Sequence, residues 1–353
     1  MARFLRCPDL KSDRKMSTGT TDHNQKRPTP DWYPHAIVLA AVGAFALCVG
    51  FLVLIRSQEA PAVPATPSHR ASGIADMPPV VPWTPDGTVN RAGKNVPLRE
   101  GPYTLMPDAP KLQSAGAFIT LLGNGLPSDR FYISDHENKG SFLGGAWVKE
   151  NVTADADGVR LDVTDTNVRD RYKLGEVQLS NRYGYGRYEV IMRPAKGSGL
   201  VSAFFTYTGE YFGDPHDEID IEFVGLSTSI IQLNYFRNGI KGNFANIKLP
   251  FDASEKDHLY AFDWKPEGIS WYVDGKLIYS TPEGDKRIPR TPGRIYISNW
   301  TGIPQMRQWH GNPDFGKRGS AYYSCISFTP LGENTRRCAD IYTPGTRFPE
   351  PIE

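Results

Sequence analysis

The sequence has few cysteines and almost no net charge. Only four of its 353 residues are cysteines, Cys7, Cys48, Cys325 and Cys338, and none are spaced as C-x-x-C. This excludes a sulfur-bound zinc cluster and a disulfide-dense scaffold. Forty Lys and Arg residues against 39 Asp and Glu leave a formal charge of +1. We therefore expect no nucleic-acid partner, because no bulk electrostatic field attracts one.

Long helical patterns are also missing from the body of the chain. Aromatic residues make up 12% of the sequence, with 34 Gly and 29 Pro, a mixture that favours strands and turns. Short segments rich in β-formers recur roughly every ten residues. They lie at 159–163, 186–192, 200–208, 218–224, 230–236, 259–264, 269–273, 277–280, 294–300 and 322–328. Together with an Asp274-Gly275 hairpin turn, they predict an all-β fold, an antiparallel β-sandwich.

One long apolar run lies near the N-terminus. Residues 36–55 are twenty positions without a charge, enough helix to cross a hydrocarbon core of about 30 Å. Residues 1–35 carry seven Lys and Arg against four Asp. This excess predicts a cytoplasmic N-terminal segment, a single-pass cell-membrane anchor and a periplasmic or extracellular remainder. The alternative is a signal peptide cleaved near residues 60–62, which would release a secreted protein.

The segment after the apolar run has the composition of a linker. Residues 56–112 contain eleven prolines and almost no apolar periodicity, which predicts an extended tether. We expect the main folded domain at 113–330 and a C-terminal tail at 331–353.

The strongest candidate for chemistry is a strand of alternating acids, DEIDIEF at 217–223. Glu218, Asp220 and Glu222 share one face of this strand, whereas the apolar residues between them point into the core. We expect the carboxylates on the solvent side. Like charges in a row disfavour a purely structural sheet, so the pattern predicts catalysis. A calcium site or a solvated acidic face is the alternative.

Paired carboxyl groups suit glycoside hydrolysis. One protonates the leaving oxygen and the other attacks the sugar, at a separation of about 5 to 5.5 Å in retaining enzymes. Glu218 and Glu222 would lie about 13 Å apart at Cα in a flat strand, so their side chains must lean together on a concave sheet. Asp220 between them can share a proton with one neighbour.

At this point the sequence resembles glycoside hydrolase family 16, most closely its bacterial 1,3-1,4-β-glucanases (lichenases) and the succinoglycan-depolymerising β-glycanases. The likeness runs from about residue 131 to residue 328. Its carrying segments are YGYGRYEV at 183–190, FFTYTG at 204–209, DEIDIEF at 217–223, FDAS at 251–254, YAFDW at 260–264 and WYVDG at 271–275. The resemblance implies a concave jelly roll.

The same resemblance implies roles for individual residues. Glu218 matches the nucleophile, Glu222 the general acid/base and Asp220 their assistant. Further positions match glucan contacts, although plain core packing is the alternative for each when it is considered without the family. These positions are Asn138, Glu176, Phe205, Tyr207, Asn234, Trp300 and Trp309.

Several positions depart from the lichenase pattern. His216 stands where lichenases usually have Trp, and Phe236, beside Arg237, stands where they have a cleft Tyr. We add His216 and Arg237 to the substrate-binding candidates and expect a substrate with acidic substituents, because a guanidinium binds carboxylates well.

The family's stabilising devices are also altered. Its disulfide is missing, because the matching positions are Gly145 and Leu174, and its structural calcium site is doubtful, because Ser324 replaces an Asp. We expect no metal and no cofactor. Cys325 and Cys338, with twelve residues between them, can form a bridge in an oxidising compartment; a free buried Cys325 is the alternative.

The sequence therefore predicts a monomeric, membrane-tethered, retaining endo-β-glycanase. Its expected substrate is a 1,3-1,4-linked β-glucan or a related bacterial exopolysaccharide. A transglycosylase on the same fold and a non-catalytic carbohydrate-binding protein are the alternatives.

Overall fold

The computed structural model describes residues 80–82, 114–139 and 141–344. The predicted segments 1–35 and 36–55 lie outside these ranges. Within them, no helix is long and apolar enough to span a membrane. Of the predicted linker, Val80–Pro82 forms the short strand β1, which pairs in parallel with β13 (Ala245–Lys248).

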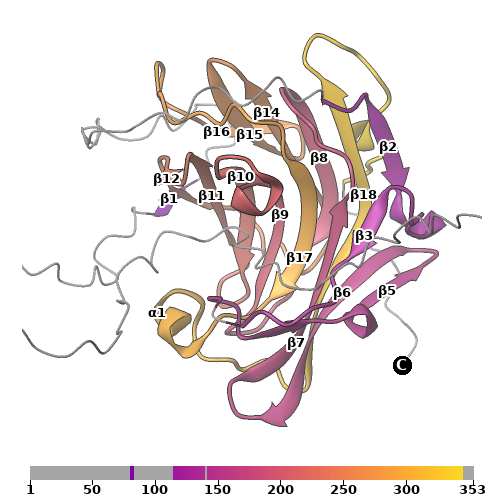
Figure 1. The fold of residues 1–353 in the computed structure, drawn as a ribbon, viewed down its shortest axis with the longest axis vertical. Coiled ribbons are helices and arrows are strands. Elements are labelled where there is room, and N and C mark those ends of the chain that lie inside the picture. The colour runs from indigo at the N-terminus through magenta and orange to yellow at the C-terminus, as the bar shows by residue number, and fades with distance from the viewer. Residues whose placement is uncertain (1–79, 83–113, 140, 345–353) are drawn as a thin grey trace, which may run out of the picture. The chain divides into compact units, whose positions relative to one another are not determined.

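One sheet carries the acidic strand at its centre. Each strand of this sheet is hydrogen-bonded to the next, from β13 at one end to β3 at the other. Most of these strands are labelled in Figure 1. After β13 the order is β11 (Ile230–Arg237), β10 (Asp217–Val224), β9 (Val201–Thr208), β17 (Arg294–Trp300), β7 (Arg171–Leu179) and β3 (Phe131–Ile133). The two-residue strand β12 (Ile240–Lys241) folds back onto β11.

The second sheet packs behind the first. Its order is β16 (Lys276–Ser280), β15 (Gly268–Val273), β14 (His258–Lys265), β8 (Gly186–Arg193) and β18 (Arg318–Pro330). Both β2 (Phe118–Leu121) and β6 (Gly158–Val168) pair with β18, and β5 (Val152–Asp155) pairs with β6. The predicted all-β sandwich is thus confirmed.

Strand β7 belongs to both sheets. Its first residues pair with β6, whereas residues 175–178 pair with β17. Leu174, Val177 and Leu179 are all fully buried, so the core side of the strand changes near Gly175. This change breaks the two-residue alternation that identifies a strand in sequence, and β7 is absent from the predicted strands for that reason. The short strand β4 (Gly145–Trp147) runs parallel to it.

The ten predicted strands are all present, and the predicted hairpin turn is confirmed. Asp274 and Gly275 both have positive φ, 49° and 77°, as a primed two-residue turn requires. The one α-helix in the described ranges is α1 (Arg307–His310).

The core between the sheets holds the acidic strand in place. Ile219, Ile221 and Phe223 are fully buried there, and each such side chain contributes about 1.5–3 kcal/mol when it leaves water. The Phe223 ring meets Tyr260 at a centroid distance of 5.1 Å. Trp271 donates its indole N–H to the Asp220 carbonyl oxygen at 3.2 Å. Both contacts fix the backbone of β10 from the core side.

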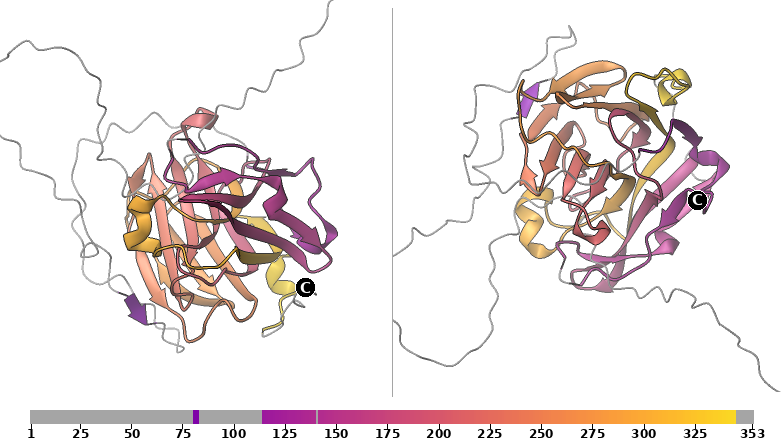
Figure 2. Two further views of the ribbon diagram at one scale, coloured as in Figure 1. Left: turned by 90° about the horizontal axis from the view of Figure 1, so that it is seen from below. Right: turned by 45° about the horizontal axis from the view of Figure 1, so that its top comes forward.

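The C-terminal segment packs on the second sheet (Figure 2). Cys338 opens the short turn η6 (Cys338–Asp340) and forms a disulfide with Cys325 of β18, which is one of the two arrangements that the sequence left open. The two cysteines form a small buried cluster with Ile191 and Leu259. The described residues 331–344 therefore form part of the folded domain.

We expect Cys338→Ser to lower the free energy of unfolding by about 2–3 kcal/mol, because the bridge closes a short loop and restricts the unfolded chain. Urea unfolding of the full chain under non-reducing conditions measures this loss. The double variant Cys325→Ser/Cys338→Ser should match the single one, and added reductant should abolish the difference from wild type. Equal unfolding midpoints without reductant would contradict a stabilising bridge.

Candidate active site

Strand β10 presents its three acids on the face opposite the core, flanked by β9 and β11. Tyr207, Phe205 and Ala203 of β9 lie opposite Glu218, Asp220 and Glu222 in register. On β11 the partners in the same order are Phe236, Asn234 and Gln232. The shared face of the three acids was predicted correctly, but the prediction that they are exposed to solvent was wrong. The exposed fractions of Glu218, Asp220 and Glu222 are 0%, 1% and 3%.

Burial dominates the electrostatics of this row. It raises the pKa of Glu218, Asp220 and Glu222 well above the usual carboxyl range, and their mutual repulsion adds to the shift. The two Asp220 oxygens have no donor among the described residues, while the group lies within hydrogen-bonding reach of Glu218. The Lys241 ammonium acts against these shifts at Asp220 and Glu222.

His216 contacts the first acid of the row directly. Its Nε2 lies 2.6 Å from Glu218 Oε2, and burial lowers the pKa of the imidazole to about 4. The ring stacks on Phe236 at a centroid distance of 5.0 Å. His216 is therefore a neutral neighbour of Glu218 near pH 7.

Asp217 anchors the start of the acidic strand. Its Oδ1 accepts the Asn238 N–H at 2.9 Å, and its Oδ2 accepts the N–H groups of Arg290 and Thr291 at 2.8 and 2.9 Å. The carboxylate thus ties β10 to the turn after β11 and to the loop before β17, so its function is structural.

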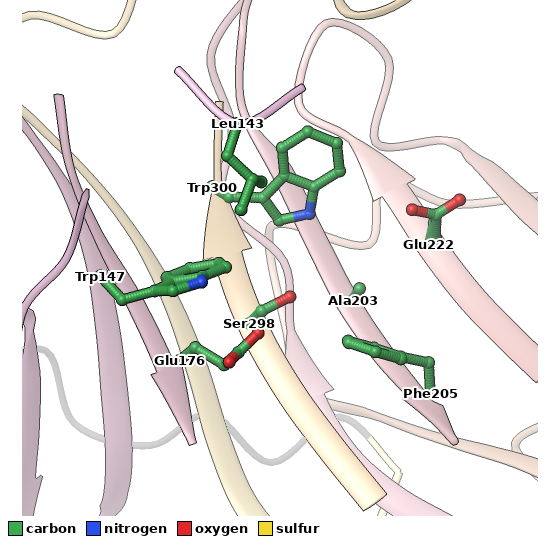
Figure 3. Close-up of a pocket in the computed structure, with 8 residues that line it drawn as sticks. All are labelled: Leu143, Trp147, Glu176, Ala203, Phe205, Glu222, Ser298 and Trp300. Carbon is green, nitrogen blue, oxygen red and sulfur yellow. The ribbon is translucent and has the colours of Figure 1, made fainter. Parts of the chain in front are cut away.

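A small cavity lies beside the last acid of the row (Figure 3). Glu222 stands on one side of it and Glu176 of β7 on the other, with indole rings on its wall. The lining residues are Leu143, Trp147, Glu176, Ala203, Phe205, Glu222, Ser298 and Trp300. Two carboxyl groups among aromatic faces suit a sugar, whose C–H groups pack on rings while its hydroxyls need polar partners.

Glu176 is a fully buried acid on the far side of this cavity. Its Oε1 accepts a hydrogen bond from the Ser134 hydroxyl at 2.6 Å, while its Oε2 has no partner in the described part of the chain. Burial raises the pKa of Glu176 to about 7. The group therefore titrates near neutral pH and can donate or accept a hydrogen bond.

The other predicted contacts divide into two groups. Phe205 and Trp300 line the cavity. Tyr207 and Asn234 lie on the strands that flank the acids. Trp309 donates its indole N–H at 2.9 Å to Oε1 of Gln232, the residue opposite Glu222 on β11. Two others lie outside the cavity lining. The Asn138 amide donates to the Gly145 carbonyl, and Arg237 donates to the Lys286 carbonyl. The expectation that the substrate carries acidic substituents stays a prediction.

Sequence reasoning missed two residues of this face. Tyr296 of β17 stacks on Phe205 at 4.8 Å, and its buried hydroxyl has no hydrogen-bond partner among the described residues. The alternation of β17 could have identified it, because Trp300 was already placed on that face. Lys241 lies opposite Phe236 on β12, and no motif in the sequence marks it. Over the described ranges, no three His, Cys, Asp or Glu side chains are grouped to hold a metal.

Comparisons with known proteins agree with this geometry. The model of "Glycosyl hydrolases family 16" matches residues 143–316. A β-glucanase of Brevibacillus brevis is 43% identical over 196 residues, which cover 54% of this chain and 74% of the relative. One from Bacillus subtilis (strain 168) is 38% identical over 218 residues, covering 62% and 88%. The protein is a glycoside hydrolase, which acts on O-glycosyl bonds. It belongs to glycosyl hydrolase family 16.

Solved structures give the same result. The Bacillus licheniformis β-glucanase matches with a TM-score of 0.58 and 38% identity over 62% of this chain and 99% of its own. A lichenase from a mouse hindgut metagenome matches with a TM-score of 0.57 and 36% identity, over 62% of this chain and all of its own. A laminarinase catalytic domain from Thermotoga maritima, 18% identical, shares the fold.

We expect Glu176→Gln to change how stability depends on pH. The folded-state pKa of about 7 exceeds the ordinary 4.5, so wild type loses stability as pH rises from about 4.5 to 7, where the unfolded chain releases the proton first. Glutamine removes this loss, which amounts to about 1.4 kcal/mol per pKa unit. The stability of Glu176→Gln relative to wild type should therefore increase by about 2–3 kcal/mol between pH 5 and pH 8.

Unfolding of both proteins across this pH range measures the effect. Glu150→Gln, at an exposed position, is the matched control and should track wild type at every pH. A difference between Glu176→Gln and wild type that does not vary with pH would contradict the burial argument.

Proposed function

We propose that this protein is a retaining endo-β-glycanase that hydrolyses 1,3-1,4-linked β-glucan or a related bacterial exopolysaccharide. The observation that carries the proposal is the acidic row. Glu218 and Glu222 lie on one face of β10, both buried, with Asp220 between them and an aromatic-walled cavity beside them. The names of the relatives, β-glucanases and a lichenase, support the substrate class.

The surroundings of the two glutamates support different roles. Among the described residues, no group donates a hydrogen bond to Glu222, and burial with the Asp220 charge raises its pKa. A raised pKa favours the protonated form of Glu222 that a general acid needs. Glu218 has a polar contact at Oε2 through His216, while its Oε1 has no partner in the same ranges. Oε1 is thereby available to attack a sugar carbon.

The proposed reaction has two steps. Glu222 transfers its proton to the glycosidic oxygen while Glu218 attacks the anomeric carbon, which breaks the bond to the leaving chain and forms a glycosyl-enzyme ester. Glu222, now a carboxylate, takes a proton from water, which attacks the same carbon and releases Glu218. We expect the two carboxyl groups to approach to about 5 Å across the bound sugar. Asp220 moves a proton to or from Glu218.

We also propose that residues 36–55 hold the enzyme at the cell membrane, with the catalytic domain periplasmic or extracellular. Signal cleavage would instead give a secreted enzyme. The Cys325–Cys338 disulfide supports a site beyond the cytoplasm, because such bridges persist in oxidising compartments. Recovery of the full chain in the membrane fraction after alkaline carbonate extraction distinguishes the two.

The full chain should hydrolyse lichenan and release product with the β-configuration first. Proton NMR of the fresh reaction measures the anomer, and laminarin, xyloglucan and succinoglycan serve as comparison substrates. Initial release of the α-anomer would refute the two-step mechanism. Transfer of the glycosyl group to an added oligosaccharide, in preference to water, would favour the transglycosylase alternative.

Variants of the two glutamates test their roles. Glu222→Ala should lose about 10²–10⁴-fold on lichenan but still react with an activated aryl glycoside, whose leaving group needs little protonation. Azide should then restore turnover and yield the β-glycosyl azide. With Glu218→Ala, azide should give the α-azide, and Glu218→Gln should bind but not cleave. Asp220→Asn is the internal control, which should hydrolyse the substrate more slowly without changing the product. Exchanged azide products would reverse the two roles.

A further inference from the structure

The contact between His216 and Glu218 is a direct polar contact between the nucleophile candidate and a neighbouring side chain. His216 Nε2 and Glu218 Oε2 are 2.6 Å apart. Phe236 stacks on one face of the imidazole, at 5.0 Å and 21° between planes, and Tyr207 meets it edge-on at 5.3 Å. The ring is thus held between two aromatic side chains with Nε2 aimed at the carboxyl group.

The protonation of the ring follows from this packing. Burial lowers the pKa of His216 to about 4, so the imidazole is neutral at neutral pH. A neutral imidazole carries one proton, on Nε2 or on Nδ1. A lone pair on Nε2 would face an ionised carboxylate at 2.6 Å, an unfavourable contact, whereas Nε2–H would donate a hydrogen bond to it.

We propose that His216 is a positioning residue for Glu218: its Nε2–H donates to Oε2, favours the ionised carboxylate and leaves Oε1 free for attack. This inference rests on the proposed function, which makes Glu218 the nucleophile. A fully buried carboxyl group needs such a donor, because burial and the Glu222 charge favour its neutral form. His216 thus acts through Glu218 and need not touch the sugar.

Other charged or titratable groups surround the pair. Asp217 adjoins His216 and acts to raise the pKa of the imidazole, but its oxygens are occupied by three backbone N–H groups. Around Glu218 stand Asp220, Glu222 and two tyrosines. The tyrosines, Tyr207 and Tyr296, have raised pKa values and stay neutral. Among these groups, only His216 places a nitrogen atom within hydrogen-bonding distance of a Glu218 oxygen.

The reverse arrangement makes the opposite prediction. If Glu218 held the proton and donated it to an unprotonated Nε2, the contact would favour the neutral carboxyl group. Removal of the imidazole would then lower the pKa of Glu218. In the proposed arrangement, removal of the imidazole raises it. The direction of the shift therefore distinguishes the two.

Two variants separate the hydrogen bond from the ring packing. His216→Phe keeps an aromatic ring against Phe236 but has no donor, whereas His216→Gln keeps an N–H donor at similar reach without the ring. The acidic limb of kcat/KM against pH reports ionisation of the nucleophile in the free enzyme. With lichenan as substrate, His216→Phe should move this limb upward by about one pH unit. It should also lower kcat/KM about tenfold or more at the wild-type optimum.

His216→Gln should keep the limb within a few tenths of a pH unit of wild type. Thermal unfolding of each variant shows that both are folded. An unmoved limb in His216→Phe, a downward shift, or the same shift in both variants would overturn the proposal.

A second measurement needs no activity. In ¹⁵N-histidine-labelled full-length protein at pH 7, the signal absent from His216→Phe should show a neutral ring protonated at Nε2. An Nε2 without a proton would overturn the inference even in an active enzyme. Conversely, an Nε2–H in a protein that cleaves none of the tested glucans would leave the contact standing and refute the proposed function instead.

Discussion

Burial of one face of β10 dictates the rest of the site. Ile219, Ile221 and Phe223 fill the core between the sheets, and a strand alternates its side chains, so Glu218, Asp220 and Glu222 must share the opposite face whatever their mutual repulsion. The Trp271 indole fixes the backbone of the strand from behind. Hydrophobic burial thus supplies the free energy that holds three acids in a row.

The neighbours of the row moderate this repulsion unequally. His216 contacts only the first acid, the second acid lies within hydrogen-bonding reach of the first, and the Lys241 charge acts on the second and third. The environments of the three therefore differ although all are buried. Chemically similar groups acquire different protonation through such asymmetry, which acid catalysis and nucleophilic attack both require.

Much of this arrangement could be predicted from the sequence, because strands and their faces depend on the local alternation of apolar and polar residues. The sequence predicted ten strands and the shared face of the acids. It did not predict their burial, which depends on aromatic residues from β9 and β11 that are distant in sequence. It also missed β7, whose core side changes near Gly175, together with Tyr296 and Lys241. The family resemblance, not periodicity, identified Glu176.

The passage of β7 from one sheet to the other has a mechanical consequence. Its early residues are hydrogen-bonded to β6 of the rear sheet, and Glu176 follows a few residues later beside β17. The continuous backbone of β7 thus connects the two sheets beside the cavity. Sliding of one sheet over the other would strain the β7 backbone next to Glu176, so the position of Glu176 depends on the packing of both sheets.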